Sequence, residues 1–292
     1  MAFLSGFDDI VSSGRPLAEF TWLRLGGPAE YFAEPRSVVE LSALVSRCRA
    51  EDVPVRVLGG GSNVLVKDDG VPGVVVKLNH PAFTAIAVDP PAIRAGGGAG
   101  LGHLISTAVR AGLAGLEPLV GIPGTVGGAL HGNSGSHGTD VGQWTRQATV
   151  MTRAGKVLQH ACDELVFAYR QSSLDELVIL EARFELEQDD PEQLTKRMQK
   201  QWIIKKANQP MSHQPAGCIF KNLRGMSAET LIEQAGLKGA QVGQAEVSQQ
   251  HANFIIAHNG ATSRDVLALI DLVRDEVSVR LGVELELEIE IW

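Results

Sequence analysis

The side chain best suited to acid–base chemistry is Cys218, in the stretch AGCIFKN at residues 216–222. A thiol has an ordinary pKa of about 8.5, so it is mostly protonated at neutral pH and releases a proton far more readily than an aliphatic hydroxyl. Cys218 can therefore act as a general acid, or it can be a small buried residue after a turn glycine. The chain has three cysteines without C-x-x-C spacing, which predicts neither a disulfide framework nor a structural zinc site.

Two glycine-rich segments could hold an anionic cofactor through the backbone. The first follows a β-branched run and comprises Gly59, Gly60, Gly61, Ser62 and Asn63. Its N–H groups and side-chain donors suit a pyrophosphate, and a tight hairpin explains the same residues equally well. The second runs from Gly121 to Gly138 and has seven glycines in 18 residues, which predicts a loop whose backbone closely approaches a flat cofactor. Neither segment matches G-x-G-x-x-G or the P-loop motif.

Two charged residues are candidates for stabilising a developing negative charge or a proton in transfer. Arg170 ends the stretch FAYR, so its guanidinium is either held for a carboxylate or enolate or lies at a surface strand end. Glu288 lies in VELELEIEIW, where apolar residues alternate strictly with four glutamates. This alternation predicts a strand over 283–292 with one buried face, and spacing alone does not select Glu288 from the solvated face.

Hydrophobic spacing predicts the elements that position these candidates. Ser37 and Glu40 form the reciprocal capping pair of a helix, and apolar spacing predicts further helices over 101–112, 227–236 and 263–282. β-branched runs predict strands that alternate with helices in the first half of the chain, and another strand in ANFIIAHNG. The charged stretch over 186–202 predicts a helix that is either a linker or the first element of a second unit.

Composition restricts the class of protein. With 292 residues, 44% of them hydrophobic, the chain can fill one large domain or two ordinary ones. Its formal net charge is −8 and its Lys and Arg residues form no basic block, which argues against a nucleic-acid partner. The first residues do not resemble a signal peptide, and no apolar run reaches about 18 residues, so we expect a cytoplasmic protein with no membrane partner. The histidines lack metal-ligand spacing, so we expect no metal. The sequence leaves the oligomeric state unknown, with a monomer favoured.

Seven stretches occur in order across nearly the whole chain: LRLGGPAEYFAEP, VLGGGSNVLV, GLEPLVGIPGTVGGALHGNSGSHG, FAYRQSSL, AGCIFKN, LIEQAGLKGAQVGQAEVSQQHANFIIAHNGAT and GVELELEIEI. Together they resemble the UDP-N-acetylenolpyruvoylglucosamine reductases, flavoenzymes of peptidoglycan precursor synthesis, in their shorter variety. One stretch could match by coincidence, but seven in the same order make the resemblance specific.

The resemblance implies an α+β fold. An FAD-binding domain of the vanillyl-alcohol-oxidase (PCMH) type is expected over residues 1–190, followed by a smaller α+β substrate-binding domain over 191–292, whose last strand (283–292) is expected to return to the active site. The implied cofactor is non-covalent FAD, and the implied reductant is NADPH. The expected FAD-binding residues are Gly59, Gly60, Gly61, Ser62, Asn63, Pro123, Gly124, Thr125, Gly127 and Gly128.

The implied reaction converts UDP-N-acetylglucosamine enolpyruvate to UDP-N-acetylmuramate. NADPH passes a hydride to the flavin, a hydride then goes to carbon 3 of the enolpyruvyl ether, and carbon 2 is protonated. Arg170 matches the family's arginine that stabilises the charge developing on the substrate carboxylate, and Glu288 matches its glutamate near that carboxylate. Cys218 stands where most relatives have a serine that protonates carbon 2. The expected substrate-binding residues are Tyr169, Lys221, Asn222, His251 and Asn253.

Three residues depart from the family pattern. Leu287 replaces a proline, Glu290 replaces an arginine, and Leu223 replaces the proline after Asn222. Loss of the arginine weakens the inference of a carboxylate site around Glu288. That carboxyl is nevertheless crowded by neighbouring glutamates, which should favour its protonated form.

Two alternatives remain beside the reductase. One is another FAD-dependent oxidoreductase of the same fold, such as a hydroxy-acid or sugar oxidase, against which the stretches AGCIFKN and HANF argue. The other is a nucleotide-sugar-binding relative without redox activity. A flavin spectrum that responds to NADPH would separate the reductase from the binding protein.

Overall fold

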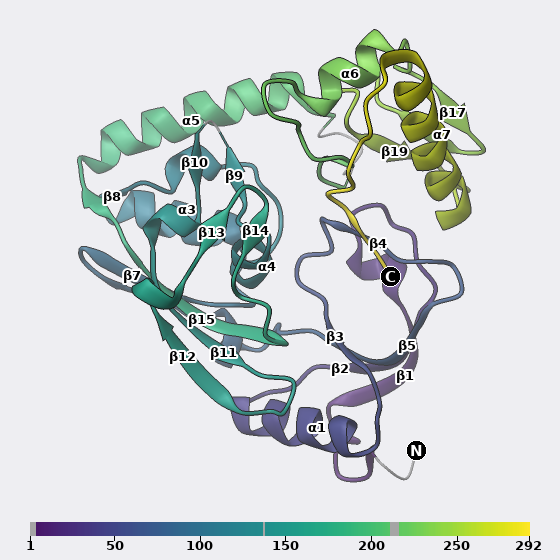
Figure 1. Cartoon of the computed structure of the whole chain (residues 1–292). Coiled ribbons are helices and arrows are strands. Elements are labelled where there is room, and N and C mark those ends of the chain that lie inside the picture. Colours follow the sequence, from purple (N-terminus) through teal and green to yellow (C-terminus); the bar gives the residue numbers. More distant parts are fainter. Residues whose placement is uncertain (1–3, 137, 211–215) are drawn as a thin grey trace. The chain divides into compact units, whose positions relative to one another are not determined.

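The computed structural model describes residues 4–136, 138–210 and 216–292 (Figure 1). Its contacts divide the chain into two compact units, and neither unit is one continuous segment. Unit 1 comprises Met1–Gly14, Glu30–Gly60 and Pro72–Ile204, whereas unit 2 comprises Arg15–Ala29, Gly61–Val71 and Lys205–Trp292. Two short N-terminal segments therefore fold with the C-terminal part of the chain.

Unit 1 contains most of a four-stranded sheet in the order β1–β2–β5–β3. Its strands are β1 (Val11–Pro16), β2 (Pro28–Ala33), β5 (Val71–Val76) and β3 (Val55–Val57). β3 pairs parallel to β5, and helix α1 (Val38–Ala50) lies between β2 and β3 in the chain. The apolar side of α1, including Cys48, packs in a core with Val74 and Val76. Burial raises the pKa of the Cys48 thiol to about 11, so this cysteine is a core residue with an unreactive thiol.

The second sheet of unit 1 is antiparallel throughout, in the order β12–β11–β15–β7–β6. Its strands are β12 (Val157–Ala161), β11 (Thr145–Met151), β15 (Val178–Glu185), β7 (Ala92–Gly96) and β6 (Ile86–Asp89). Helices α3 (Leu101–Arg110) and α4 (Val126–His131) share its core, and α2 (Pro81–Thr84) precedes β6. The core of this part is formed by Ile93, Leu104, Ile105, Leu130 and Phe184, all fully buried.

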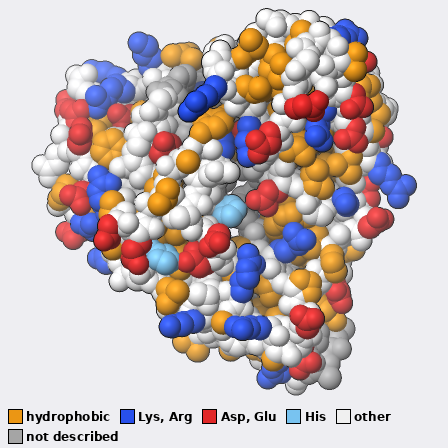
Figure 2. Space-filling view, viewed as in Figure 1, with side chains coloured by type: hydrophobic (Ala, Val, Ile, Leu, Met, Phe, Trp, Pro, Cys, Tyr) orange, Lys and Arg blue, Asp and Glu red, His pale blue; other side chains and the backbone are white. Residues whose placement is uncertain are grey.

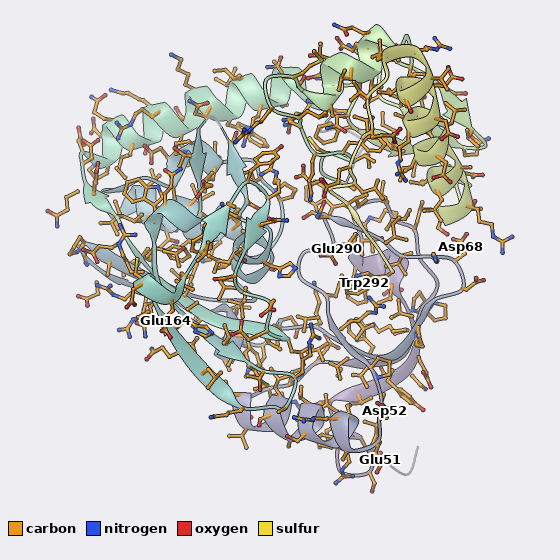
Figure 3. The ribbon with its side chains drawn as sticks, viewed as in Figure 1. Glu51, Asp52, Asp68, Glu164, Glu290 and Trp292 are labelled. Atoms are coloured by element: carbon orange, nitrogen blue, oxygen red, sulfur yellow. The ribbon has the colours of Figure 1, made fainter. Side chains whose placement is uncertain are left out.

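Unit 2 contains a three-stranded antiparallel sheet, β17 (Gln241–Val242), β18 (Ala245–Val247) and β19 (Ile255–Ala257), with helices α6 (Ala228–Gln234) and α7 (Ser263–Leu281). The segment 61–71 is fastened to the start of α7, because both carboxylate oxygens of Asp68 accept from the N–H of Ser263 at 3.1 Å. The N–H of Asp68 donates in return to the Ser263 hydroxyl at 2.9 Å. Figure 3 labels Asp68 on this segment.

The remaining helix, α5 (Pro191–Asn208), joins the two units along the chain. Short pairs complete the structure: β8 (Leu113–Ala114) with β16 (Glu187–Gln188), β9 (Gly135–Ser136) with β10 (Thr139–Asp140), β13 (Phe167–Ala168) with β14 (Gln171–Ser172), and β4 (Val64–Leu65) with β20 (Glu290–Ile291). Acidic and basic side chains are interspersed over the visible face (Figure 2). A search of the described part of the chain finds no helix that is both long and apolar enough to span a bilayer.

The predicted helices around 101–112, 227–236 and 263–282 are confirmed, and so is the strand within 252–260. The capping pair of α1 is only half correct. The Ser37 hydroxyl accepts from the N–H of Glu40 at 3.1 Å, but the Glu40 carboxylate accepts from the N–H of Arg36 at 2.7 Å rather than from Ser37. The glutamate therefore satisfies the donor one residue before the cap.

Two further predictions need correction. The segment 121–138 is not a loop throughout, since α4 forms within it: the Thr125 hydroxyl caps the helix, and Val126, Ala129 and Leu130 are buried. The terminal strand is shorter than predicted, because only Glu290–Ile291 is paired in a ladder. The apolar side of 283–292 is still the more buried one, so alternation predicted burial correctly but overestimated strand pairing.

At Gly282, which ends α7, we can test whether backbone conformation alone requires a glycine. Gly282 has φ +68°, and a Cβ there would meet no atom within 4 Å. We expect Gly282→Ala to lower the free energy of unfolding by about 1 kcal/mol through left-handed strain alone. Gly102, inside α3, also faces open space but has no positive φ, so Gly102→Ala should be neutral or stabilising. Urea unfolding followed by circular dichroism would check this, and equal destabilisation by both variants would refute the explanation.

Candidate active site

In unit 1 the two predicted glycine segments touch each other through their backbones. A Cβ on Gly60 would lie 2.5 Å from the Cα of Gly124, and one on Gly59 would lie 2.8 Å from the hydroxyl oxygen of Thr125. Such distances are shorter than any ordinary contact, so side chains at these positions would push the segments apart. The structure thus brings Gly59 and Gly60 together with Gly124 and Thr125, as expected for two walls of one cofactor site.

Lys77 supports the first glycine segment and was not predicted from the sequence. Its ammonium donates a short hydrogen bond to the carbonyl oxygen of Gly59. Burial lowers the pKa of Lys77, and the nearby carboxylate of Glu34 acts in the opposite direction. The signal available in the sequence was a lysine directly after the apolar run of β5.

The glycine run at 96–98 has a structural role in the same place. A Cβ on Gly97 or Gly98 would lie within 2 Å of a carbonyl oxygen, that of Ile179 or Leu78 respectively. The carbonyl of Gly97 accepts from the N–H of Gly127 at 2.8 Å, and the N–H of Leu101 donates to the carbonyl of Gly124 at 3.0 Å. This run therefore fixes the second glycine segment, although it matched no cofactor motif.

The GGGSN segment fits a cofactor that carries a diphosphate. The backbone N–H groups of Gly59, Gly60 and Gly61 donate to no acceptor among the described residues, and Gly61 is buried. Buried N–H groups without a partner are rare in native proteins, and several adjacent ones form an anion-binding surface. Gly59 and Gly60 belong to unit 1, whereas Gly61, Ser62 and Asn63 belong to unit 2.

Arg170 lies at the tip of a tight hairpin in unit 1. β13 and β14 pair Ala168 with Gln171, so Tyr169 and Arg170 alone form the turn. Arg170 has φ +56°, a left-handed conformation that costs an L-residue roughly 1–2 kcal/mol and that tight turns often require. Its guanidinium donates to the carbonyl of Gly135 at 3.3 Å and lies 5.5 Å from the centre of the exposed Tyr169 ring.

A buried asparagine holds this hairpin in place. The side-chain amide of Asn133 donates to the carbonyl of Ala168 at 2.8 Å, and its oxygen accepts from the N–H of Gly142 at 3.1 Å. Asn133 is only 3% exposed, so neither bond is exchanged readily for water. The Ser172 hydroxyl adds a bond to the carbonyl of His131 at 2.9 Å. Arg170 is therefore carried by a rigid turn rather than by a loose surface loop.

In unit 2 the half-buried Cys218 lies in a segment held by backbone bonds on both sides. The N–H of Gly217 donates to the carbonyl of Ser62 at 2.8 Å, and the N–H of Ile219 donates to the carbonyl of Asn253 at 3.0 Å. No disulfide includes Cys48, Cys162 or Cys218, which all lie in the described part of the chain. General acid chemistry requires a cysteine that is not part of a disulfide.

The C-terminal segment lies directly beside the cysteine segment. The N–H of Glu288 donates to the carbonyl of Ile219 at 2.8 Å, and the N–H of Lys221 donates to the carbonyl of Glu286 at 2.8 Å. The Asn63 side chain donates to the carbonyl of Glu288 at 2.9 Å, and β20 continues parallel to β4. Unit 2 therefore brings together Asn63, Cys218 and Glu288, which are far apart in sequence.

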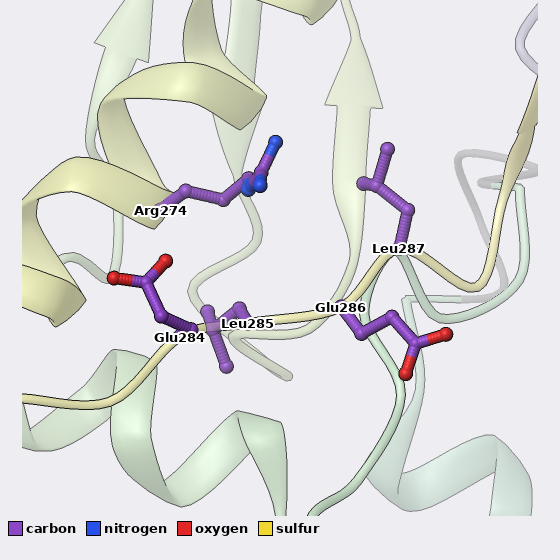
Figure 4. A pocket seen from close by; sticks show the side chains of 5 residues that line it. All are labelled: Arg274, Glu284, Leu285, Glu286 and Leu287. Atoms are coloured by element: carbon purple, nitrogen blue, oxygen red, sulfur yellow. The ribbon is translucent and has the colours of Figure 1, made fainter.

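The side chains of Lys221 and Asn222 contact two different parts of unit 2. The ammonium of Lys221 lies 2.5 Å from a carboxylate oxygen of Glu286. The exposed Asn222 side chain accepts from the N–H of Ala228 at 2.9 Å, at the start of α6. Glu286 also lines a hollow of about 330 Å³, together with Arg274 of α7 and with Glu284, Leu285 and Leu287 (Figure 4).

Asn253 is engaged entirely by the cysteine segment. Its side-chain oxygen accepts from the N–H of Phe220 at 2.9 Å, and its side-chain amide donates to the carbonyl of Phe220 at 2.8 Å. The residue is 2% exposed. The Asn253 side chain therefore makes the two hydrogen bonds to Phe220 that a paired strand residue would make, and it fixes the backbone two residues after Cys218.

His251 is half-buried and neutral at neutral pH. Burial lowers the pKa of His251 to about 4; a backbone hydrogen bond and Glu233 oppose the shift, and Lys238 adds to it. The Nδ1 atom accepts from the N–H of Asn253 at 3.3 Å, so the proton is on Nε2, which lies 3.3 Å from the Glu229 carboxylate. The contact with Glu229 is therefore a hydrogen bond from a neutral imidazole at neutral pH and not an ion pair.

The departures from the family pattern have local explanations. The N–H of Leu287 has no acceptor among the residues described, so leucine and proline are both compatible with this backbone position. Leu223 uses its N–H in a bridge to the carbonyl of Met226 at 3.0 Å, a bond that proline cannot make. The Glu290 carboxylate accepts from the indole N–H of Trp292 at 3.3 Å, and both residues are labelled in Figure 3.

Comparison with known proteins places both parts of the chain in one family. Residues 209–292 match the C-terminal domain of UDP-N-acetylenolpyruvoylglucosamine reductase, and residues 29–160 match an FAD-binding domain. The chain is 43% identical over 284 residues to UDP-N-acetylenolpyruvoylglucosamine reductase 2 of Symbiobacterium thermophilum, covering 97% of this chain and 92% of the relative. It is 41% identical over 279 residues to the reductase of Heliobacterium modesticaldum, covering 94% and 88%.

A solved structure agrees with these matches. The crystal structure of the reductase from Thermus caldophilus has a TM-score of 0.82 and 37% sequence identity, with 97% of this chain and 98% of that chain covered. The predicted fold class is confirmed: an α+β protein with an FAD-binding domain of the vanillyl-alcohol-oxidase type and a substrate-binding domain. The matched segments end at residue 160 and begin again at residue 209, so they do not test the domain boundary at residue 190, which stays a prediction.

The contact between the glycine segments can be tested through cofactor affinity. We expect Gly60→Ala to weaken FAD binding at least about tenfold, because the new methyl group meets the rigid backbone of Gly124. Titration of apoprotein with FAD, followed by flavin fluorescence, would measure the dissociation constant. Gly102→Ala, which meets no atom, is the matched control. If Gly60→Ala binds FAD as tightly as the control, the two segments do not form one site.

The lowered pKa of His251 leads to a prediction about how stability depends on pH. Because the pKa of His251 is lowered to about 4, the unfolded chain binds a proton first as pH falls below about 6.5, so stability is lost from there down to about pH 4. His251→Asn keeps an acceptor for the N–H of Asn253 but does not titrate. We expect the free energy of unfolding to fall less for the variant between pH 7 and pH 4.5. Burial is the largest cause that raises the pKa of Glu229, and this shift opposes the loss of stability caused by His251 as pH falls. The quantity to compare is therefore the difference in unfolding free energy between the parent and His251→Asn. Equal losses in both would contradict the assignment.

Proposed function

The chain belongs to the UDP-N-acetylenolpyruvoylglucosamine reductase family, and we propose that it reduces UDP-N-acetylglucosamine enolpyruvate to UDP-N-acetylmuramate, with NADPH as reductant and FAD as cofactor. The observation that carries the proposal for this chain is the backbone pairing of the Cys218 segment with the Glu288 segment. The reaction would serve peptidoglycan precursor synthesis in the cytoplasm.

The glycine segments would hold the cofactor. Bound FAD supplies hydride transfer from NADPH to the enolpyruvyl double bond. Gly59, Gly60 and Gly61 offer backbone donors to the diphosphate, and the second segment, including Pro123, Thr125, Gly127 and Gly128, offers a wall with few side chains. Ser62 and Asn63 add side chains at the edge of the first segment. In this chain Asn63 also holds the carbonyl of Glu288, so the first segment and the C-terminal strand are mechanically linked.

Arg170 and Glu288 would handle the charge that develops on the substrate. Hydride addition to carbon 3 shifts negative charge toward the carboxylate, and a guanidinium on a rigid turn can stabilise that charge without reorganising. Glu288 assists only in its protonated form, because an ionised carboxylate would repel the same charge. Tyr169, Lys221 and Asn222 would bind the nucleotide part of the substrate.

Cys218 would protonate carbon 2. Its thiol supplies the proton that balances the hydride, so that NADPH and one proton are consumed for each double bond reduced. Asn253 would act through the backbone of Phe220, since both ends of its side chain are already engaged there. His251 in turn fixes the N–H of Asn253. We therefore assign these two residues to positioning the acid segment rather than to touching the substrate.

An absorption spectrum tests the function directly. We expect the purified protein to show an oxidised flavin band that NADPH bleaches under nitrogen and that UDP-N-acetylglucosamine enolpyruvate restores. Glycolate and simple sugars are the matched control oxidants, and they should not restore the band. A colourless protein would support a nucleotide-sugar-binding relative, whereas reoxidation by sugars would support a different oxidoreductase.

Substitution of Cys218 tests the acid. We expect Cys218→Ala to be reduced by NADPH at the parent's rate but to reduce the enolpyruvyl substrate at least about 100-fold more slowly, because general acid catalysis typically contributes that much. Cys218→Ser should keep most of the activity. Stopped-flow absorbance separates the two half-reactions. A Cys218→Ala protein that reoxidises with substrate as fast as the parent would assign the proton to another donor.

A further inference from the structure

Helix α5 carries a basic and apolar surface that the reductase chemistry does not use. From residue 193 to residue 208 the helix has five basic residues and no acidic one, in a chain whose formal net charge is −8. In the middle of this stretch Trp202 is 41% exposed and Ile203 is 66% exposed. A soluble helix normally turns such side chains toward the core, so this stretch has the reverse of the usual pattern.

The two sides of α5 are clearly separated. Leu194, Met198, Gln201 and Lys205 are buried or half-buried, and at 3.6 residues per turn they occupy an arc of about 60°. On the opposite side, an arc of about 160° holds the exposed side chains of Lys196, Lys200, Trp202, Ile203 and Lys206, and also Glu192, Gln199, Ala207 and the half-buried Thr195. We call the three lysines, Trp202 and Ile203 the α5 surface.

The lysines of the α5 surface are available to an outside partner. Arg197, by contrast, is paired with Asp189 and Glu117, and Lys205 is buried. For Lys196, Lys200 and Lys206 the described residues provide no ion pair and no hydrogen bond to the side chain. Three exposed lysines therefore lie on the same side of the helix as one tryptophan and one isoleucine.

This chemistry fits an anionic lipid surface better than a protein partner. The centres of protein–protein interfaces are depleted in lysine, and they require a complementary shape that a single convex helix does not offer. A bilayer interface needs no complementary shape. It accepts tryptophan at the level of the headgroups, and it lets lysine side chains extend to anionic phosphates while their methylene stems cover apolar surface.

We propose that the α5 surface binds reversibly to membranes rich in anionic phospholipid. Trp202 and Ile203 enter the headgroup region, and the three lysines contact lipid phosphates. The formal net charge of the whole chain is −8, but charges at physiological salt are screened beyond about 8 Å, so the local charge of one helix decides the contact. The remaining acidic surface keeps the binding weak and sensitive to salt.

The test is flotation of the FAD-loaded protein with vesicles made of equal parts phosphatidylglycerol and phosphatidylcholine. We expect binding at low salt that falls at least about tenfold with pure phosphatidylcholine or in about 0.5 M salt. The double variants Lys196→Glu/Lys200→Glu and Trp202→Ser/Ile203→Ser should each lose at least about tenfold in affinity, while both keep the flavin spectrum and NADPH oxidation.

The matched charge control is Arg153→Glu/Lys156→Glu, which reverses two exposed basic residues in a turn far along the chain from α5. Val279→Ser, at a site that is 83% exposed on α7, is the apolar control. Both controls should bind vesicles like the parent. The proposal is overturned if the parent does not float with the anionic vesicles, if the controls lose as much affinity as the α5 variants, or if acidic polypeptides bind the α5 surface and vesicles do not.

Discussion

The chemistry of unit 2 depends on a backbone arrangement in which one short segment is held from three directions. Gly217 is bonded to Ser62, Ile219 to Asn253 and to Glu288, and Lys221 to Glu286. These partners come from the N-terminal loop, from the turn before β19 and from the last residues of the chain. A cysteine and a glutamate that are 70 positions apart in the sequence are thereby held on neighbouring backbone segments.

The same principle governs the glycine segments of unit 1. There the contacts are between backbones, and the absence of Cβ atoms at Gly60 and Gly97 allows the chain to pass itself at distances that no other residue permits. Lys77 then secures the carbonyl of Gly59 from the end of a buried strand. In both units, therefore, main-chain hydrogen bonds and close backbone approaches hold the candidate site segments in place.

The sequence predicted most of the longer helices and the family, because caps, apolar spacing and seven ordered stretches are local signals. It did not predict that residues 15–29 and 61–71 fold with the C-terminal part, since that division depends on long-range contacts such as Asp68 with Ser263. It also missed α4, because the glycines that disfavour a helix are outweighed there by the Thr125 cap and by burial of Val126 and Leu130. The roles of Asn253 and Lys77 were likewise invisible, since each acts on the backbone of a distant residue.

The roles proposed for Cys218, Arg170 and Glu288 all depend on where these side chains lie relative to the bound substrate. The most direct measurement is a crystal structure of the protein with oxidised FAD and UDP-N-acetylglucosamine enolpyruvate. The account predicts the Cys218 sulfur within about 3.5 Å of carbon 2, on the face of the double bond turned away from the flavin, with Arg170 and Glu288 at the substrate carboxylate. A different residue or an ordered water at carbon 2, with the thiol turned toward the core, would contradict it.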